Sequence, residues 1–220
     1  MMTPMEFLLW TKGPMFQIAL AIFTVGMLIR LVEILALGRP HNYAEARGSE
    51  LLPGLTTVFK RFKADGGTFK RAPFDVVVGI IWHIGFIVAL LLFIPHVELI
   101  QSTFGIGWPA LPNPMVDAIT AVTLLGLVAA LVHRLTDPVK RFLSTTEDYL
   151  IWGLTFLVLL TGYLSYHRLI NPYPLALGIH ILTAEVFLIL LPFTKLTHIF
   201  TTFIARWYNG ANFGRKGVQS

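Results

Sequence analysis

An apolar stretch from Tyr173 to Phe203 sets the strongest constraint on how this chain folds. It is longer than the roughly 20 residues that an α-helix needs to cross a membrane. His180 and His198 lie in it, 18 residues apart, which is about five helical turns. One continuous helix would project both imidazoles from one face, roughly 27 Å apart along its axis. Because ionisable groups inside a membrane segment are costly, this pattern favours two metal centres in series over two merely hydrogen-bonded histidines.

The composition is that of a polytopic membrane protein. Of the 220 residues, 55% are hydrophobic and 13% are charged. There is no cysteine, which excludes protein-ligated iron–sulfur clusters, thioether-attached haem and disulfides. A metal centre must therefore use His, Met or carboxylate ligands. The net charge of +5 lies beside apolar segments, so we expect no nucleic-acid partner. Glu6 and Lys12 argue against a cleavable signal peptide at the N-terminus.

Hydrophobic segments predict an all-α fold, a bundle of five transmembrane helices in a single integral membrane domain over residues 1–220. Barrel strands are excluded because each segment is far longer than a strand and lacks strict alternation. The predicted helices cover about 14–37, 75–100, 115–133, 149–167 and 174–203.

The charged connections predict an orientation. Seven Lys and Arg residues lie between residues 38 and 72, and more follow the third and fifth segments. The positive-inside rule then places the N-terminus outside and the C-terminus in the cytoplasm. We expect a multi-pass protein of a prokaryotic cell (inner) membrane.

The histidines are the candidate metal ligands. The chain has His41, His83, His96, His133, His167, His180 and His198. A six-coordinate haem b needs two axial imidazoles from facing helices at similar depth. Counting residues from the membrane edges pairs His83 with His198 near the cytoplasmic side. It pairs His180 with His96 near the outer side, with His167 in reserve. On an ideal helix His96 points away from the face of His83, and a bend at Pro95 would re-aim it.

Three further residues are candidates for the surrounding chemistry. Lys195 lies one turn before His198, where it would neutralise a haem propionate or simply mark the helix end. Glu185 lies inside the apolar stretch. It is a candidate for proton transfer or quinol binding, or it makes a simple hydrogen bond to another helix. His133 is either a neighbour of a propionate or quinone site or an interfacial histidine.

Two segments resemble a known family. They are WHIGFIVALLLFIPH (82–96) and ALGIHILTAEVFLILLPFTKLTHIF (176–200). The chain is similar to the membrane cytochrome b subunits related to the gamma subunit of respiratory nitrate reductase, and to the membrane subunits of heterodisulfide reductase and of the dissimilatory sulfite reductase-linked complex. The Pro192–Lys195 run followed by His198 is the most specific piece, and KRAPF before residue 75 resembles the heterodisulfide reductase branch.

The resemblance implies a dihaem cytochrome b. Such a subunit exchanges electrons between membrane quinone and a cytoplasmic iron–sulfur subunit, with catalytic subunits on other chains. The family pattern places four axial histidines on the second and fifth helices, and His83, His180 and His198 match it. In the nitrate reductase pattern the fourth falls at Phe93, and the nearest histidine is His96.

Two other functions stay open. One is a self-contained transmembrane b-type reductase that needs no iron–sulfur partner. The other is a haem-free membrane anchor, or a protein whose histidines line a proton path. In the leading interpretation the partner docks on the basic segment 55–71 and the C-terminal tail, and the lipid bilayer and quinone are the remaining partners.

Overall fold

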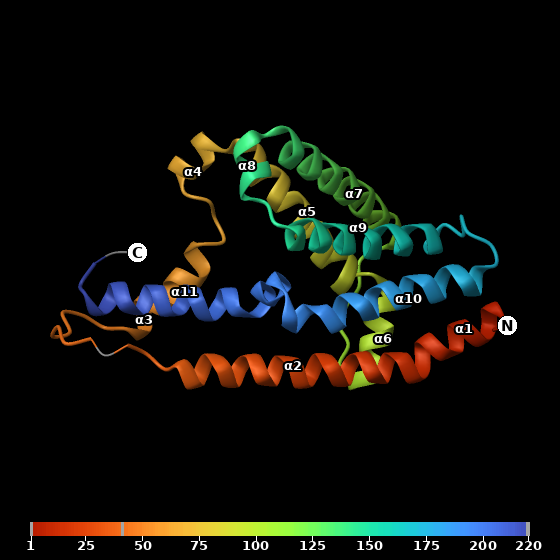
Figure 1. Cartoon of the computed structure of the whole chain (residues 1–220), viewed down its shortest axis with the longest axis horizontal. Coiled ribbons are helices and arrows are strands. Elements are labelled where there is room, and N and C mark those ends of the chain that lie inside the picture. The colour runs from red at the N-terminus through yellow and green to blue at the C-terminus, as the bar shows by residue number, and fades with distance from the viewer. Residues whose placement is uncertain (1, 41, 219–220) are drawn as a thin grey trace. The chain divides into compact units, whose positions relative to one another are not determined.

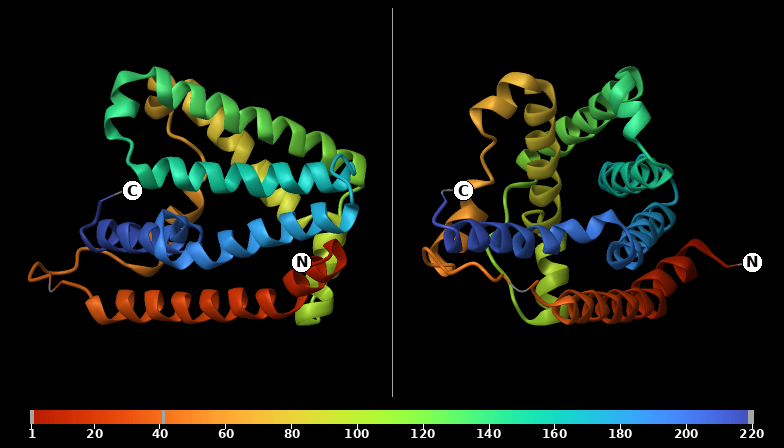
Figure 2. Two further views of the ribbon diagram at one scale, coloured as in Figure 1. Left: turned by 45° about the vertical axis from the view of Figure 1, so that its right-hand side comes forward. Right: turned by 60° about the vertical axis from the view of Figure 1, so that its left-hand side comes forward.

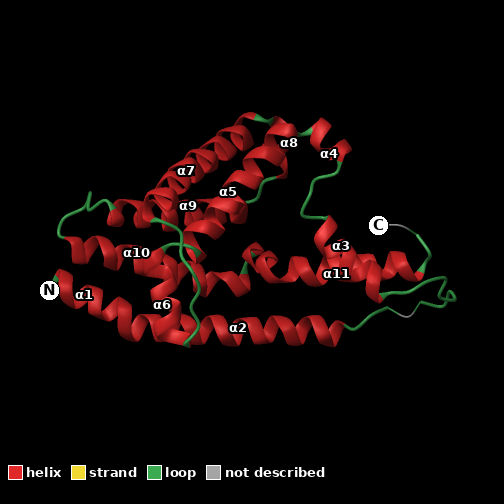
Figure 3. Ribbon diagram, turned by 180° about the vertical axis from the view of Figure 1, so that it is seen from behind, coloured by secondary structure: helices red, strands yellow, loops and turns green. Residues whose placement is uncertain are grey.

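The computed structural model describes residues 2–40 and 42–218, and these form helices joined by loops, with no strand among them (Figures 1 and 3). Within the described residues five helical stretches are long and apolar enough to cross a membrane. They confirm the all-α fold with five spanning segments. His41, assigned from the sequence to a polar loop, lies outside the described residues.

The chain divides into two compact units, which are described separately. The first contains residues 2–22 and 74–189, and the second contains residues 23–40, 42–73 and 190–218. His96, His167 and His180 belong to the first unit. His198 belongs to the second.

The first span begins earlier than the sequence analysis predicted. Helix α1 (Pro4–Trp10) starts at Thr3, whose side chain and Glu6 form a capping box with each other's backbone N–H groups. A π-helical turn, η1 (Thr11–Met15), contains Pro14 and leads into α2 (Phe16–Leu37). The prediction that the helix starts near Pro14 was wrong, because the wider turn accommodates a residue without an N–H.

The second predicted helix, 75–100, is two helices. Helix α5 (Pro73–Leu91) ends before Phe93, whose backbone is extended, and α6 (Ile94–Phe104) begins there with Pro95 in its first turn. Proline fits a first helical turn because that position needs no N–H donor. Trp108 in the following turn donates from Nε1 to the Leu91 carbonyl at 2.6 Å and so caps the end of α5. The break re-aims His96, as a bend at Pro95 would.

The third and fourth helices lie side by side in the first unit (Figure 2). Helix α7 (Asn113–Thr136) and α9 (Thr146–Tyr166) agree with the prediction to within a few residues. They are joined by a short helix, α8 (Pro138–Leu143). Trp152 packs on the buried Leu127 and donates from its indole to the Leu127 carbonyl at 2.9 Å. This contact holds α9 against α7 beside the core.

The fifth predicted helix, 174–203, is also interrupted. Helix α10 (Tyr173–Leu190) is followed by two short 3-10 turns, η2 (Leu191–Phe193) and η3 (Lys195–Thr197), and then by α11 (His198–Arg215). Thr194 between the turns is extended. The single-helix premise for placing His180 and His198 on one face was therefore wrong, since Pro192 lies where the α-helix ends.

In the second unit, α3 (Leu51–Lys60) packs against α11. A Cβ at Gly210 would lie 2.4 Å from Thr57 Oγ1, so only glycine permits this approach. Helix α4 (Gly66–Arg71) follows and is capped by Asp65. The basic segment 55–71, a candidate docking surface, is thus mostly helical, and its Thr57 side is buried.

Candidate functional site

Two histidines from different helices lie together in the first unit. His96 is in the first turn of α6, and His180 is in the second turn of α10. Their ring centroids are 6.0 Å apart and their planes differ by 23°. The break between α5 and α6 makes this possible, because it gives His96 a direction that a continuous helix would not. The structure therefore brings together the two residues that the sequence analysis paired at the outer side.

The second nitrogen of each ring has an oxygen partner. His96 Nδ1 is 2.7 Å from the Ala89 carbonyl oxygen, which the helix break exposes. His180 Nδ1 is 3.3 Å from Thr161 Oγ1, and that hydroxyl is 3.0 Å from Thr183 Oγ1. Metal-ligating histidines commonly have such a partner on the other nitrogen, which fixes the ring orientation and the tautomer. With Nδ1 contacted in this way, Nε2 of each ring would be the atom available to a metal.

A glycine makes room for the His180 ring. A Cβ added to Gly162 on α9 would lie 2.9 Å from His180 Cε1 and 3.2 Å from its Nδ1. Real Cβ atoms are not found at the first of these distances. Gly162 therefore lets α9 approach the imidazole closely, one residue after Thr161.

An aromatic path connects the histidine pair to a third histidine. The Phe93 ring lies 5.3 Å from the His96 ring and 5.5 Å from the Tyr166 ring, both edge-on. The Tyr166 ring lies 5.1 Å from the His167 ring. His167 Nε2 is 2.7 Å from Asp117 Oδ1. His167 was the reserve ligand for His180, but here its Nε2 contacts a carboxylate of α7.

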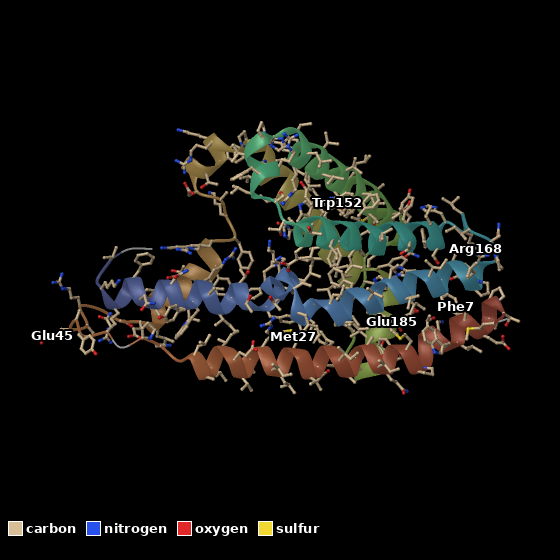
Figure 4. All side chains as sticks on the ribbon, in the orientation of Figure 1. Phe7, Met27, Glu45, Trp152, Arg168 and Glu185 are labelled. Atoms are coloured by element: carbon tan, nitrogen blue, oxygen red, sulfur yellow. The ribbon has the colours of Figure 1, made fainter. Side chains whose placement is uncertain are left out.

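Glu185 is almost completely buried on α10, with 2% of its surface exposed (Figure 4). Neither of its carboxylate oxygens has a hydrogen-bond partner among the described residues. Buried polar atoms in proteins nearly always have a partner, so each exception needs an explanation. The sequence alternative in which Glu185 bonds to another helix therefore has no support in the described residues.

His83 belongs to the first unit and His198 to the second, so their pairing at the cytoplasmic side stays a prediction. Each ring has a local contact: His83 Nδ1 is 2.7 Å from the Gly79 carbonyl, and His198 Nδ1 is 2.7 Å from the Lys195 carbonyl. These contacts orient both rings as they do in the outer pair. Lys195 is one turn before His198, as predicted.

His133 lies near the end of α7, in a charged cluster. Its Nε2 is 3.7 Å from Asp75 Oδ1, and the same oxygen accepts a hydrogen bond from Lys140 Nζ. The Phe74 ring contacts the His133 ring edge-on at 4.5 Å. These neighbours tie α5, α7 and α8 together at one end of the first unit, which favours the interfacial interpretation of His133.

Within the described residues no group of three or more His, Asp or Glu side chains is arranged to hold a metal ion. A haem with two axial imidazoles needs only two protein ligands, because the macrocycle supplies the rest. The relevant unit is therefore a pair of histidines rather than a cluster.

Comparison with known proteins gives one relationship. A scan against protein-family models found no match. The chain is 31% identical over 216 residues to a protein of Nitratidesulfovibrio vulgaris (strain Hildenborough), and the match covers 93% of this chain and 92% of the relative. The two chains belong to one family. The relative's description states no activity or ligand, so the site must be interpreted from its residues.

Sequence reasoning missed several residues of this site. Asp117 lies inside the predicted 115–133 segment, and an ionisable residue within a membrane segment is by itself a signal of function. Thr161 and Gly162 carried no comparable signal, and Phe93 was noted only as the position that the nitrate reductase pattern gives to the fourth histidine. Their positions depend on how α6, α9 and α10 pack, and sequence spacing does not supply that information.

Proposed function

We propose that this chain is a dihaem cytochrome b membrane subunit that carries electrons between membrane quinone and a cytoplasmic iron–sulfur subunit of a respiratory complex. The observation that carries the proposal is the His96–His180 pair: two near-parallel imidazoles from separate helices, each with its Nδ1 beside an oxygen. The resemblance to the cytochrome b subunits related to nitrate reductase gamma leads to the same function.

The spacing of the pair suits axial ligation. Metal–imidazole bonds measure about 2.0–2.1 Å, taking zinc as the guide, so two ligating nitrogens lie roughly 4 Å apart. Adding the distance from nitrogen to ring centre on each side separates the centroids by roughly 6–6.5 Å. The observed centroid distance of 6.0 Å is close to this value. A bound haem would supply one-electron chemistry at this position.

The remaining candidates have supporting roles. His83 and His198 are the proposed ligands of a second haem, whose propionate Lys195 would neutralise. Glu185 is a proton carrier or a hydrogen-bond partner for bound quinol, which would explain its unpartnered buried oxygens. The proposed orientation puts His96 and His180 near the outer face, and the basic segments 38–72 and 206–216 in the cytoplasm. There, segment 55–71 would meet the iron–sulfur partner in a prokaryotic cell membrane.

An absorption spectrum of the purified protein, before and after dithionite, tests the proposal. We expect a reduced b-type α band and two haems per chain by pyridine haemochrome assay. Absence of any band after expression with sufficient haem would overturn it and leave a haem-free anchor. Co-purification from the native membrane then separates a subunit that retains an iron–sulfur partner from a self-contained b-type reductase.

A further inference from the structure

The His167–Asp117 contact has the form of a proton-accepting dyad. His167 lies at the end of α9 and Asp117 lies near the start of α7, so they meet at one end of the helical pair. Building on the proposed function, we propose that His167 and Asp117 take the protons released when a quinol is oxidised beside the His96–His180 pair.

The carboxylate sets the tautomer of the imidazole. An ionised Asp117 only accepts hydrogen bonds, so the Nε2 atom 2.7 Å away carries the hydrogen. In a neutral ring the Nδ1 atom then keeps a lone pair and is the basic nitrogen. When Nδ1 gains a proton, Asp117 stabilises the resulting imidazolium. In hydrolytic enzymes a carboxylate orients a histidine in the same way, and the histidine takes the proton as a general base.

The aromatic path places the dyad within reach of the electron acceptor. His96, Phe93, Tyr166 and His167 form a series of ring contacts of 5.1–5.5 Å. Tyr163 adds a further contact, with its ring centre 4.4 Å from that of His167. Aromatic surfaces suit the flat ring of a quinol, which can stack on them in offset or edge-on geometry. Electrons would leave toward His96, and protons would leave toward His167.

A quinol that is oxidised at this site loses two electrons and two protons and becomes a quinone. Each O–H bond that breaks is replaced by an N–H bond at His167 Nδ1, one at a time, and the imidazolium passes its proton to water before the second transfer. A haem held by His96 and His180 would supply one-electron chemistry, so it would take the two electrons one at a time and pass the first onward before the second. The partly exposed side chains, 33% for His167 and 29% for Asp117, give these protons an outlet.

The other titratable or charged groups near His167 are few. Tyr163 and Tyr166 contact its ring from α9, and His96 lies beyond Phe93 on α6. Arg168 is adjacent in sequence, but its guanidinium lies over the Tyr173 ring at 5.2 Å. Among these groups Asp117 is the carboxylate that directly contacts His167.

Asp117→Asn in the full-length, haem-loaded protein tests the dyad most directly. The asparagine amide donates to Nε2, which moves the ring hydrogen to Nδ1 and removes the base while keeping the shape. We expect unchanged haem content, and haem reduction by menadiol slowed by about 10²- to 10⁴-fold, the usual contribution of a general base. His167→Gln should behave similarly.

A binding measurement provides a second readout that needs no turnover. Naphthol presents one phenolic O–H and a flat ring, so it should donate to His167 Nδ1. Equilibrium dialysis should show about tenfold weaker naphthol binding to Asp117→Asn, equivalent to one lost hydrogen bond. Glu98→Gln is the matched control, because it removes an exposed carboxylate from α6 and should keep native values.

Native menadiol rates and native naphthol binding in Asp117→Asn would overturn the dyad. Loss of haem from both variants would also overturn it, since the pair would then be structural support for the ligands. Failure of the proposed function would give a different result. The native protein would then contain no haem, but it could still bind naphthol, and Asp117→Asn would still weaken that binding.

Discussion

His96 and His167 lie at the two ends of the aromatic path through Phe93 and Tyr166, and their partners differ. The neighbour of His96 is a second imidazole, with ring centres 6.0 Å apart. The neighbour of His167 is a carboxylate, 2.7 Å from its Nε2. Phe93 and Tyr166 lie between the two histidines. The same residue type is therefore placed in two electrostatic settings within one helical unit.

The two settings suit different chemistry. Two imidazoles side by side can both bind one metal ion through neutral nitrogens. An imidazole beside a carboxylate can exchange protons, because the carboxylate stabilises the imidazolium. At this end of the unit, the partner of each histidine, an imidazole or a carboxylate, is what distinguishes the proposed ligand from the proposed base.

Replacing His96, a proposed haem ligand, with alanine should produce the largest effect. We expect His96→Ala to lose one of two haems, because a six-coordinate haem needs both axial imidazoles. His167→Ala should keep both, since its ring contacts Asp117 rather than the pair. The measurements are haem per chain by pyridine haemochrome assay and the low-spin signal in electron paramagnetic resonance.

The opposite result would reverse the assignment. Loss of haem in His167→Ala alone would make His167 the ligand of His180 and would remove the dyad. Two intact haems in both variants would mean that neither histidine is an axial ligand.

Much of the scaffold was predictable from local chemistry. Helices α7 and α9 agree with the predicted segments because each is mostly apolar, has no proline beyond its first turn, and has charged or polar residues at its ends. The Thr3–Glu6 capping box was also legible in the sequence, although the predicted start at Pro14 ignored it.

The helix interruptions mark the limit of that approach. Hydropathy gave no sign of a break at Phe93 or Thr194, since both lie in apolar surroundings, and Pro95 and Pro192 were compatible with a kink as well as a full break. The pairing of His167 with Asp117 depends on two helices separated by 50 residues. Such contacts follow from tertiary packing rather than from residue spacing.

Gly162→Ala should have an intermediate effect on the His96–His180 pair. The new methyl group would meet His180 Cε1 at 2.9 Å and push the ring away from Thr161. Overpacking of this kind costs about 1–3 kcal/mol, so we expect haem affinity at this site to fall roughly 5- to 150-fold. The haem-loss rate to apomyoglobin measures it.

Gly153→Ala is the control for this substitution. Gly153 is on the same helix, α9, and a Cβ there meets nothing within 4 Å. It should leave haem retention unchanged. The His167–Asp117 contact should stay intact in both variants. Equal haem loss from the two alanine variants would show that the effect comes from helix α9 in general and not from the His180 ring.

The smallest effect is expected at Glu50, a carboxylate that accepts hydrogen bonds from two guanidinium groups. In the second unit Glu50 Oε1 is 3.2 Å from Arg215 Nη1, and Oε2 is 3.0 Å from Arg39 Nη1. The hydrogen bond from Arg215, followed by that from Arg39, lowers the pKa of Glu50 below its ordinary value of 4.5. A lowered folded-state pKa stabilises the fold above the unfolded value, and this contribution is lost as pH falls through the folded value.

Glu50→Gln should therefore lower the thermal unfolding temperature slightly at pH 7, and the difference from native protein should vanish as pH falls below 4.5 toward the folded-state pKa. Added salt should shrink it at pH 7, because exposed ion pairs are screened. Glu45→Gln, an exposed carboxylate in the loop before α3, is the control and should match native protein at every pH. A Glu50→Gln deficit that stays constant with pH and salt would mean that the side chain acts through packing. Glu50 would then differ in kind from Asp117, whose charge is what the dyad requires.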